Sequence, residues 1–185
     1  MSLEYAILGF LSYAPLSGYD LKKFFDNSVC HFWTADQCQI YRTLARLGEA
    51  GSVEMRVVEQ SARPDRKVYS ITEKGRKDLE EWLAQPFQGG DARNPVLLKT
   101  FFSGKCTDQE VLTAFEDAEQ QLRAMMAVYE TTPQMIDHFK AQVGSEREAF
   151  FWNLTLEWGV RITQANLAWV QSIIARIQTN QVPQQ

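Results

Sequence analysis

The chain has 185 residues, of which 45% are hydrophobic and 23% are charged, and its formal net charge is −4. This balance excludes a disordered chain, and the length suits one large domain or two small ones. No apolar run reaches the roughly 20 residues that span a bilayer. The N-terminus lacks the basic segment of a signal peptide and carries Glu4 early. We therefore expect a cytoplasmic protein with no membrane partner.

The cysteines and histidines predict neither a disulfide framework nor a metal site. Cys30, Cys38 and Cys106 are odd in number and follow no spacing pattern. Cys30, His31 and Cys38 lack the second ligand pair that would complete a zinc site. His138, like His31, stands outside any catalytic motif, and no phosphate-binding loop occurs. We expect no cofactor, no metal and no catalytic residues, and therefore no enzyme.

Two helices are predicted near the N-terminus. Apolar residues at helical spacing predict the first over residues 3–11, and Pro15 ends it. Ser17 and Asp20 have the spacing of a capping box, in which each side chain accepts a hydrogen bond from the other residue's backbone. A second helix therefore begins at this point.

A third helix is predicted to begin at Thr34, which has Gln37 at capping-box spacing, and to end at Gly51. Placing its residues at 100° steps separates two faces. The inward face carries Ile40, Leu44 and Leu47. The outward face carries Ala35, Cys38, Gln39, Arg42, Arg46 and Glu49, with Tyr41 on its flank.

The outward face of this helix suits the major groove of DNA. Gln39 and Arg42 project from the first turns, where the neighbouring side chains are small. Glutamine pairs with adenine edges, and arginine pairs with guanine edges or phosphate. The positive end of the helix dipole also suits a phosphate. The alternative is a polar face that is merely solvated.

A basic β-hairpin and a fourth helix are predicted next. Alternating and β-branched residues predict strands over residues 53–60 and 67–72, joined by residues 61–66. Thr72 then caps a helix that ends near Leu83. The order helix, helix, helix, hairpin, helix indicates a winged helix-turn-helix.

Positive charge is concentrated in this part of the acidic chain. From Thr34 to Lys77 there are nine basic against six acidic residues, a local net charge of +3. Arg63, Arg66 and Lys67 lie at the expected tip of the hairpin, beside the third helix, where they suit DNA phosphates. A solvated tip that protects the sheet edge is the alternative.

The second half of the chain is predicted to be helical. Proline and glycine in residues 85–95 indicate a linker between a winged-helix domain (1–84) and a helical dimerisation domain (96–179), with a tail over 180–185. A capping box at Thr107 opens a helix with a heptad seam. The seam comprises Val111, Phe115, Ala118, Leu122, Met125 and Tyr129.

The last helix carries two apolar stripes, which one neighbouring helix cannot cover. One stripe comprises Phe151, Leu154, Trp158, Ile162, Ala165, Trp169, Ile173 and Ile177. The other comprises Leu156, Val160, Leu167, Val170 and Ile174. A central place in a bundle would satisfy both stripes, but with few helices in this half we favour a second chain. The residues predicted to dimerise are Phe115, Leu122, Leu154, Trp158, Ile162, Trp169 and Ile173. Plain packing is the alternative, as is a small-molecule pocket lined by Trp152, Trp158 and Trp169.

Four stretches resemble the PadR family of bacterial transcription regulators. W-x5-Q-I-Y-R-T-L-A-R-L-x-x-A-G (Trp33–Gly51) and P-D-R-K-V-Y-S-I-T-E-K-G-R-K-D-L-E-E-W-L (Pro64–Leu83) carry the likeness in the first half. N-P-V-L-L-K-T-F-F-S-G (Asn94–Gly104) and residues 155–170 are similar to the helical C-terminal domain of the longer members, those related to the virulence activator AphA. Cys38 departs from the family's usual serine.

The resemblance implies a sequence-specific regulator that binds double-stranded DNA at a palindromic operator as a homodimer, mostly as a repressor. Carried over to matching positions, it implies DNA contact by Gln39, Tyr41 and Arg42 on the helix and by Arg63, Arg66 and Lys67 on the wing. Gln37 and Arg46 complete the candidate DNA-binding set, and Tyr41 could instead be a core or hinge residue. The alternatives are a protein–protein interaction module and a regulator whose C-terminal domain binds a small aromatic effector.

Overall fold

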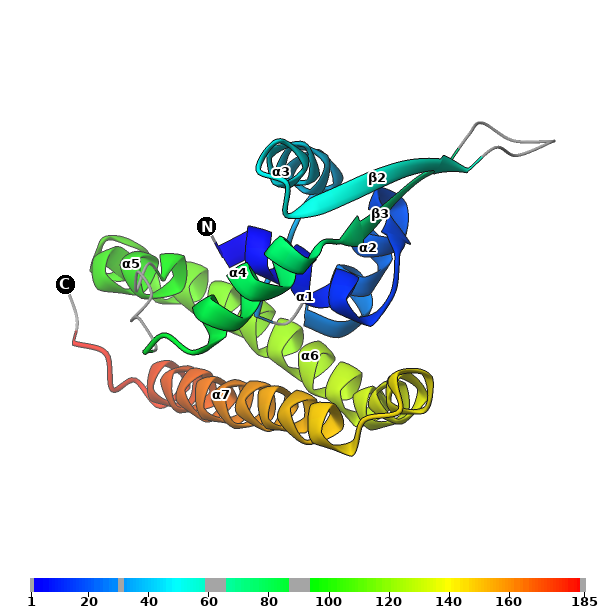
Figure 1. The fold of residues 1–185 in the computed structure, drawn as a ribbon. Helices are drawn as coiled ribbons and strands as arrows, with labels where there is room; N and C mark the ends of the chain where they lie inside the picture. The colour runs from blue at the N-terminus through cyan, green and yellow to red at the C-terminus, as the bar shows by residue number, and fades with distance from the viewer. Residues whose placement is uncertain (1, 30–31, 59–65, 87–93, 184–185) are drawn as a thin grey trace. The chain divides into compact units, whose positions relative to one another are not determined.

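The computed structural model describes residues 2–29, 32–58, 66–86 and 94–183. The chain divides into two compact units, Met1–Gln88 and Gly89–Gln185. The fold is mainly helical with a small three-stranded sheet, as the sequence predicts (Figure 1). Most of the linker predicted over 85–95 lies outside the described residues.

The N-terminal unit combines helices with an antiparallel sheet of strand order β1-β3-β2. In chain order its elements are α1 (Ser2–Tyr13), β1 (Leu16–Ser17), α2 (Gly18–Phe24), the π-helix η1 (Phe25–Val29), α3 (Gln37–Glu49), β2 (Val53–Val58), β3 (Arg66–Ile71) and α4 (Glu73–Leu83).

The capping boxes set where the helices of this unit begin. Ser17 and Asp20 form the predicted capping box at the start of α2. The predicted start of the third helix at Thr34 is wrong. Helix α3 begins at Gln37, because Asp36 is the N-cap and forms its own capping box with Gln39. Two candidate boxes overlap in this stretch of sequence, and the carboxylate of Asp36 takes the cap.

Strand β1 is an element that the sequence did not predict. Leu16 lies opposite Tyr69 and Ser17 opposite Val68, so the short strand pairs with β3. Two residues are too few to show the alternation that marks a strand in sequence. Only pairing with β3 makes this segment part of the sheet.

Aliphatic side chains from α1, α2, α3 and the sheet form the core of this unit. Ile40 and Leu44 are fully buried and Leu47 is buried beside them, which confirms the predicted inward face of α3. Burying each such side chain stabilises the fold by about 1.5–3 kcal/mol. Ala35, predicted to face outward, is instead buried in the same core, because it precedes the helix.

The hairpin of β2 and β3 is anchored at one end. Its register runs from Val53 opposite Ile71 to Val58 opposite Arg66. Val53 and Ile71 are buried in the core, whereas the remaining residues of β2 are exposed. The hairpin therefore projects from the unit beside α3 as a wing (Figure 1).

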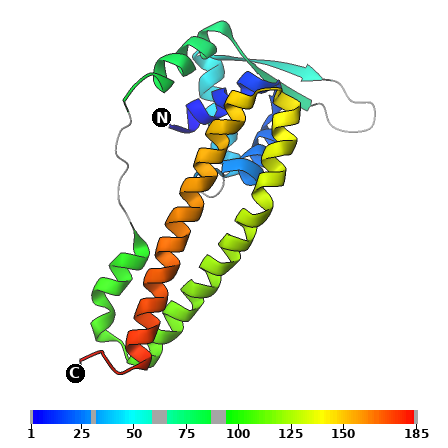
Figure 2. The same cartoon turned by 90° about the horizontal axis from the view of Figure 1, so that it is seen from below.

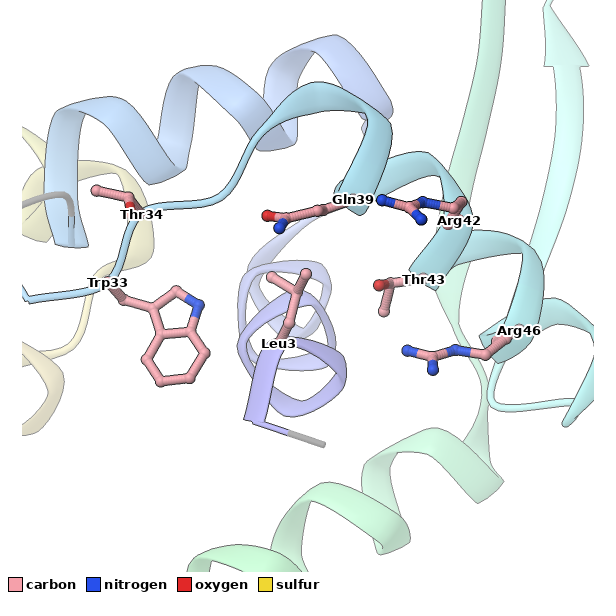
Figure 3. Close-up of a pocket in the computed structure, with 7 residues that line it drawn as sticks. All are labelled: Leu3, Trp33, Thr34, Gln39, Arg42, Thr43 and Arg46. Carbon is pink, nitrogen blue, oxygen red and sulfur yellow. The ribbon is translucent and has the colours of Figure 1, made fainter. Parts of the chain in front are cut away.

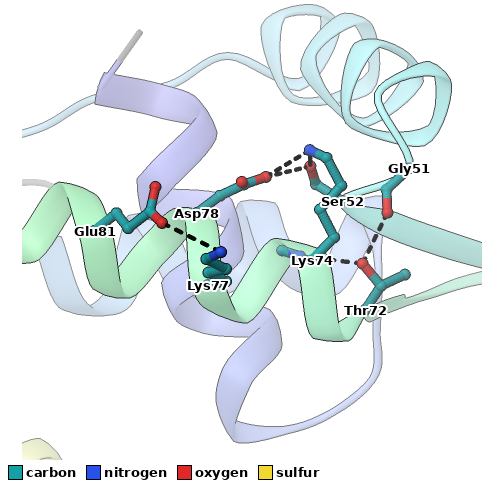
Figure 4. Close-up of polar contacts among 8 residues, drawn as sticks. Gly51, Ser52, Thr72, Lys74, Lys77, Asp78 and Glu81 are labelled. Carbon is teal, nitrogen blue, oxygen red and sulfur yellow. Dashed lines mark hydrogen bonds and ion pairs between the residues drawn. The ribbon is translucent and has the colours of Figure 1, made fainter.

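Helix α4 is fastened to the turn between α3 and β2 by polar contacts (Figure 4). The Thr72 hydroxyl donates to the Gly51 carbonyl oxygen at 2.8 Å. The buried Ser52 hydroxyl donates to Asp78 at 2.7 Å, and the Lys74 ammonium donates to the same carboxylate at 2.8 Å. The N-terminal half of α4 is thus held to the base of the wing.

The C-terminal unit is a long helical hairpin preceded by a short helix (Figure 2). The predicted capping box at Thr107 opens the first long helix, and the left-handed Gly144 ends it. The Ser145 side chain caps the second long helix. The elements of the C-terminal unit are α5 (Pro95–Phe102), the 3₁₀ helix η2 (Ser103–Lys105), the first long helix α6 (Asp108–Val143) and the second long helix α7 (Glu146–Gln178).

Two apolar clusters hold α6 against α7. One centres on Tyr129, Ile136, Ala149 and Leu156, and the other on Phe115, Val170 and Ile174. The predicted heptad seam on α6 faces α7 except at Met125, which is exposed, while Met126 packs in its place. A straight helix has 3.6 residues per turn, so a seam of period 3.5 drifts off the contact line.

Candidate nucleic-acid interface

The outward face of α3 consists of exposed polar and small side chains. Gln37 occupies the first helical position, and Cys38 and Arg42 follow on the exposed side with Ala45. Small side chains at 38 and 45 let another surface approach the helix axis closely. The face therefore has the combination of small and projecting side chains that is expected of a helix that enters a groove of DNA.

The side chain of Gln39 takes part in the N-terminal capping box of its own helix. Its side-chain oxygen accepts from the Asp36 backbone N–H at 3.2 Å, and Asp36 accepts from the Gln39 backbone at 2.7 Å. This leaves the amide N–H groups of Gln39 as donors at an exposed position. Gln39 can donate to a phosphate or base, but its oxygen is engaged.

The two arginines of α3 differ in their contacts. The Nε of Arg42 donates to the Cys38 carbonyl at 3.4 Å, which lays the side chain along the exposed face. The guanidinium of Arg46 forms an ion pair with Glu4 of α1 at 3.0 Å. Arg46 therefore turns to the flank of α3 that faces α1, and its charge is partly neutralised.

A shallow depression of about 610 Å³ lies on that flank (Figure 3). It combines an indole and an aliphatic side chain with two guanidinium groups and three polar side chains. The lining residues are Leu3, Trp33, Thr34, Gln39, Arg42, Thr43 and Arg46. An indole and an aliphatic side chain beside guanidinium groups have the chemistry to hold an aromatic anion.

Tyr41 lies on the opposite flank of α3 and packs against α2. A methyl group at Gly18 would lie 2.5 Å from its ring carbon Cε1, so the ring rests directly on the glycine backbone. Burial, and then the neighbouring Tyr41, raise the pKa of Tyr69. The Tyr41 side chain is still 42% exposed. It therefore joins α3 to α2 and presents part of its ring to solvent.

The cations of the wing fall into three groups. Arg63 lies outside the described residues. Arg66 forms an ion pair with Asp20 of α2. Lys67 is exposed and, within the part of the chain that the structure describes, has no ion-pair partner; Arg56 of β2 is likewise exposed and was not singled out in the sequence. The place of Arg56 at a polar position of the alternating strand that precedes the basic hairpin tip was the available signal.

The residues predicted to dimerise separate into two groups. Phe115 is buried within its own chain, where its ring meets Trp169 edge to face at 5.8 Å between centroids. Leu122 and Ile173 pack against the same cluster. The predicted residues that remain exposed on α7 are Leu154, Trp158 and Ile162, and the large apolar side chains of Phe150 and Phe151 on the same helix are exposed as well.

Helix α5 presents a second exposed apolar surface. Its exposed large side chains include Phe101, with 81% of its surface accessible. Four others of this helix are exposed as well: Val96, Leu97, Leu98 and Phe102. Together with the exposed side chains of α7, these residues are a group of large hydrophobes and not the single scattered ones that are normal on a protein surface.

The described residues hold no cluster that could bind a metal ion, and among them no helix has the length and apolarity to cross a bilayer. Cys38 and Cys106 are free thiols at exposed positions. Cys30 and His31, considered as metal ligands from the sequence, lie outside the described ranges.

Comparison with known families matches both halves of the chain. Residues 7–81 match the model described as "Transcriptional regulator PadR-like family". Residues 92–178 match the model described as "Virulence activator alpha C-term".

Individual relatives cover nearly the whole chain. The negative transcriptional regulator PadR of Bacillus subtilis is 28% identical over 95% of this chain and 97% of its own. Its structure with operator DNA gives a TM-score of 0.78 at 27% identity, covering 96% of this chain and 99% of that one. Its structure with p-coumaric acid gives 0.73 at 25% identity, with coverages of 96% and 99%. The virulence activator AphA of Vibrio cholerae gives 0.74 at 28% identity, with coverages of 96% and 98%.

Proposed function

The chain belongs to the PadR-like family of transcriptional regulators, with a C-terminal half of the virulence-activator type, and from this premise we propose that it binds a palindromic operator as a homodimeric repressor. The observation that carries the proposal is the pairing of α3, with its exposed Arg42, and a projecting cationic wing in one winged-helix unit. The B. subtilis relative with this fold was crystallised on operator DNA and is a negative regulator.

Helix α3 would enter the major groove through its N-terminal half. Gln37 and Arg42 are placed to reach base edges or phosphates, and Gln39 contributes its amide donors. Tyr41 would contact the backbone with the exposed edge of its ring. Arg46 is bound to Glu4 and needs that ion pair to open before it can contribute.

The wing supplies positive charge to the flanking phosphates. Lys67 is the described wing cation that we assign to phosphate contact, whereas Arg56 on the neighbouring strand lies opposite Val68 and therefore projects from the other face of the hairpin. An acidic chain can bind DNA in this way because only the charge that faces the backbone enters the contact. We assign the protein to the cytoplasm, where a regulator of this family meets its operator.

Two copies would associate through the apolar surfaces of the C-terminal unit. The exposed stripe of α7, centred on Trp158, and the apolar helix α5 support this assembly. A two-fold dimer covers the same patch on both copies and brings together two reading helices. Half-sites would then lie about one helical turn, roughly 34 Å, or a multiple of it apart.

In vitro selection from random duplexes, followed by footprinting, tests the proposal and identifies the operator sequence in the same experiment. We expect a protected palindrome bound by the dimer with steep salt dependence. Log affinity falls as log salt rises, and Arg42→Ala combined with Lys67→Ala should make this fall shallower, reducing the magnitude of the slope by about 0.9 for each lost phosphate contact. Arg176→Ala removes one charge from α7 in the other unit and serves as the matched control.

Failure to enrich any duplex, or an affinity that does not respond to the Arg42 and Lys67 substitutions, would contradict the proposal. A stable complex with another protein in the absence of salt-dependent DNA binding would favour the interaction-module alternative.

A small aromatic acid is a second ligand that the structure supports. The depression beside α3 has an indole wall and the guanidinium groups of Arg42 and of Arg46, the second of which is paired with Glu4, and the B. subtilis relative was crystallised with p-coumaric acid. Because Arg42 both lines the depression and lies on the reading face, an anion bound there would compete with DNA. Titration with p-coumaric acid should quench Trp33 fluorescence and release bound duplex, and Trp33→Phe should remove most of the fluorescence change. Release of the duplex with no quenching would place the effector elsewhere.

A further inference from the structure

The first turn of α2 contacts both parts of the DNA-binding surface. Ser17 pairs with Val68 of β3 through the sheet, and Gly18 lies under the ring of Tyr41 from α3. Asp20 forms an ion pair with Arg66 at the end of the described wing. One short turn of backbone therefore meets the reading helix on one side and the wing on the other.

Asp20 is held firmly before it meets the wing. Its Oδ2 accepts from the Ser17 backbone N–H at 2.9 Å and from the Ser17 hydroxyl at 2.6 Å. Burial alone raises the pKa of this carboxyl, but the hydrogen bonds from Ser17 and then Arg66 outweigh burial and lower the pKa below its ordinary value. The carboxylate is thus a fixed, negatively charged hydrogen-bond acceptor on α2.

Arg66 lies at the end of the described hairpin that is farthest from the buried pair of β2 and β3. It lies opposite Val58, the last described pair of the hairpin, whereas the buried pair Val53 and Ile71 is at the other end. Among the described pairs of the hairpin, the pair at Arg66 is the farthest from the buried one, so a contact at Arg66 has the longest lever on the direction of the wing. Its ion pair with Asp20 joins two elements 46 residues apart in sequence.

We infer that Arg66 is a positioning residue, which fixes the wing relative to α3 by binding Asp20, and that it does not contact phosphate. The inference rests on the proposed DNA-binding function and deepens it. It separates two cations that are adjacent in sequence: Lys67 contacts DNA, and Arg66 holds the wing that carries Lys67.

Whether Asp20→Asn raises or lowers the affinity for DNA distinguishes a positioning role of Arg66 from direct contact with phosphate. If Arg66 were a phosphate ligand restrained by Asp20, then Asp20→Asn would release a cation, remove a negative charge and tighten DNA binding. If Arg66 positions the wing, the same substitution loosens the wing. DNA binding then weakens by about fivefold, the upper range for one exposed ion pair.

The experiment measures binding of the selected duplex by fluorescence anisotropy at several salt concentrations, using the full-length protein. We expect Asp20→Asn and Arg66→Ala each to weaken binding by about fivefold, and the double variant to be no weaker than either. Arg66→Ala should leave the salt slope unchanged, whereas Lys67→Ala should reduce it by about 0.9.

Asp26→Asn is the matched control, because it removes the same charge from an exposed ion pair with Lys22 that does not involve the wing. Arg66→Gln keeps the experiment decisive if Asp20→Asn disturbs the helix cap, since Arg66 lies at an exposed position of β3 outside that cap. Tighter binding by Asp20→Asn, or a reduced slope for Arg66→Ala or Arg66→Gln, would overturn the inference. Failure of the wild-type protein to bind any selected duplex would instead overturn the proposed function.

Discussion

Gly75 is the residue at which the attachment of α4 can be tested most directly. Substitution by alanine would place a methyl group 2.1 Å from the Ser52 carbonyl oxygen and 2.9 Å from Cγ1 of Ile71. The carbonyl cannot withdraw freely, because it also accepts from the Thr72 backbone N–H at 3.1 Å. Helix α4 must therefore move away from the base of the wing.

The size of the effect follows from three contributions. Overpacking costs about 1–3 kcal/mol, and weakening one backbone hydrogen bond costs about 1 kcal/mol. The higher helix propensity of alanine offsets about 1 kcal/mol. We expect Gly75→Ala to lower the free energy of unfolding by about 2 kcal/mol, which is a fall in melting temperature of about 10 °C for a unit of this size.

Gly48→Ala is the matched control in calorimetry at equal protein concentration. Gly48 also lies in a helix, but a methyl group there meets nothing within 4 Å. The propensity gain should therefore appear alone, as an increase in stability of about 0.5–1 kcal/mol. A Gly75→Ala variant as stable as Gly48→Ala would refute the proposed packing of α4.

Three further predictions concern acid stability, assembly and the angle between the helices. Hydrogen bonds from Lys74 and a serine hydroxyl lower the pKa of Asp78, so its contribution to stability is present above the ordinary value of 3.8 and is lost as the pH falls through the folded-state pKa. Urea unfolding should thus show a shallower acid-induced loss for Asp78→Asn than for the wild type; equal curves would contradict this. Trp158→Asp should convert the dimer to monomer in light scattering and weaken operator binding by more than about tenfold, through loss of the second reading helix; an unchanged mass would remove the α7 stripe from the interface. Gly18→Ala should displace the Tyr41 ring and weaken DNA binding by about fivefold with little loss of stability, because a side chain can move where a backbone cannot; unchanged affinity would show that the ring's position is immaterial.

Local patterns in the sequence were sufficient to predict several elements of both units. The inward face of α3 could be predicted because burial repeats at helical spacing, and the caps at Ser17 and Thr107 could be predicted because their partners lie three residues away. The same local reasoning was wrong at Thr34, where a neighbouring residue formed an equivalent box. Spacing identifies candidate caps but does not choose between overlapping ones.

The candidate site was predicted in composition but not in its contacts. Placing Arg42 and Lys67 on exposed surfaces needed only the periods of a helix and a strand. That Arg46 turns to Glu4, and that Arg66 turns to Asp20, could not be inferred, because each partner lies on an element brought near by packing. A count of basic residues assigns all four cations to DNA. The contacts show that two of them, Arg46 and Arg66, are already paired with carboxylates of other elements.

The sequence by itself determined the helices, the hairpin and the excess of positive charge around them, since each depends on neighbours within a few residues. Only the tertiary structure decided that Leu16 and Ser17 form a strand, which apolar stripe of α7 packs on α6, and which cations already have partners. The physical reason is the separation in sequence over which each interaction acts. Propensity, capping and periodicity act along the chain, whereas burial and ion pairing between distant elements exist only after the chain has folded.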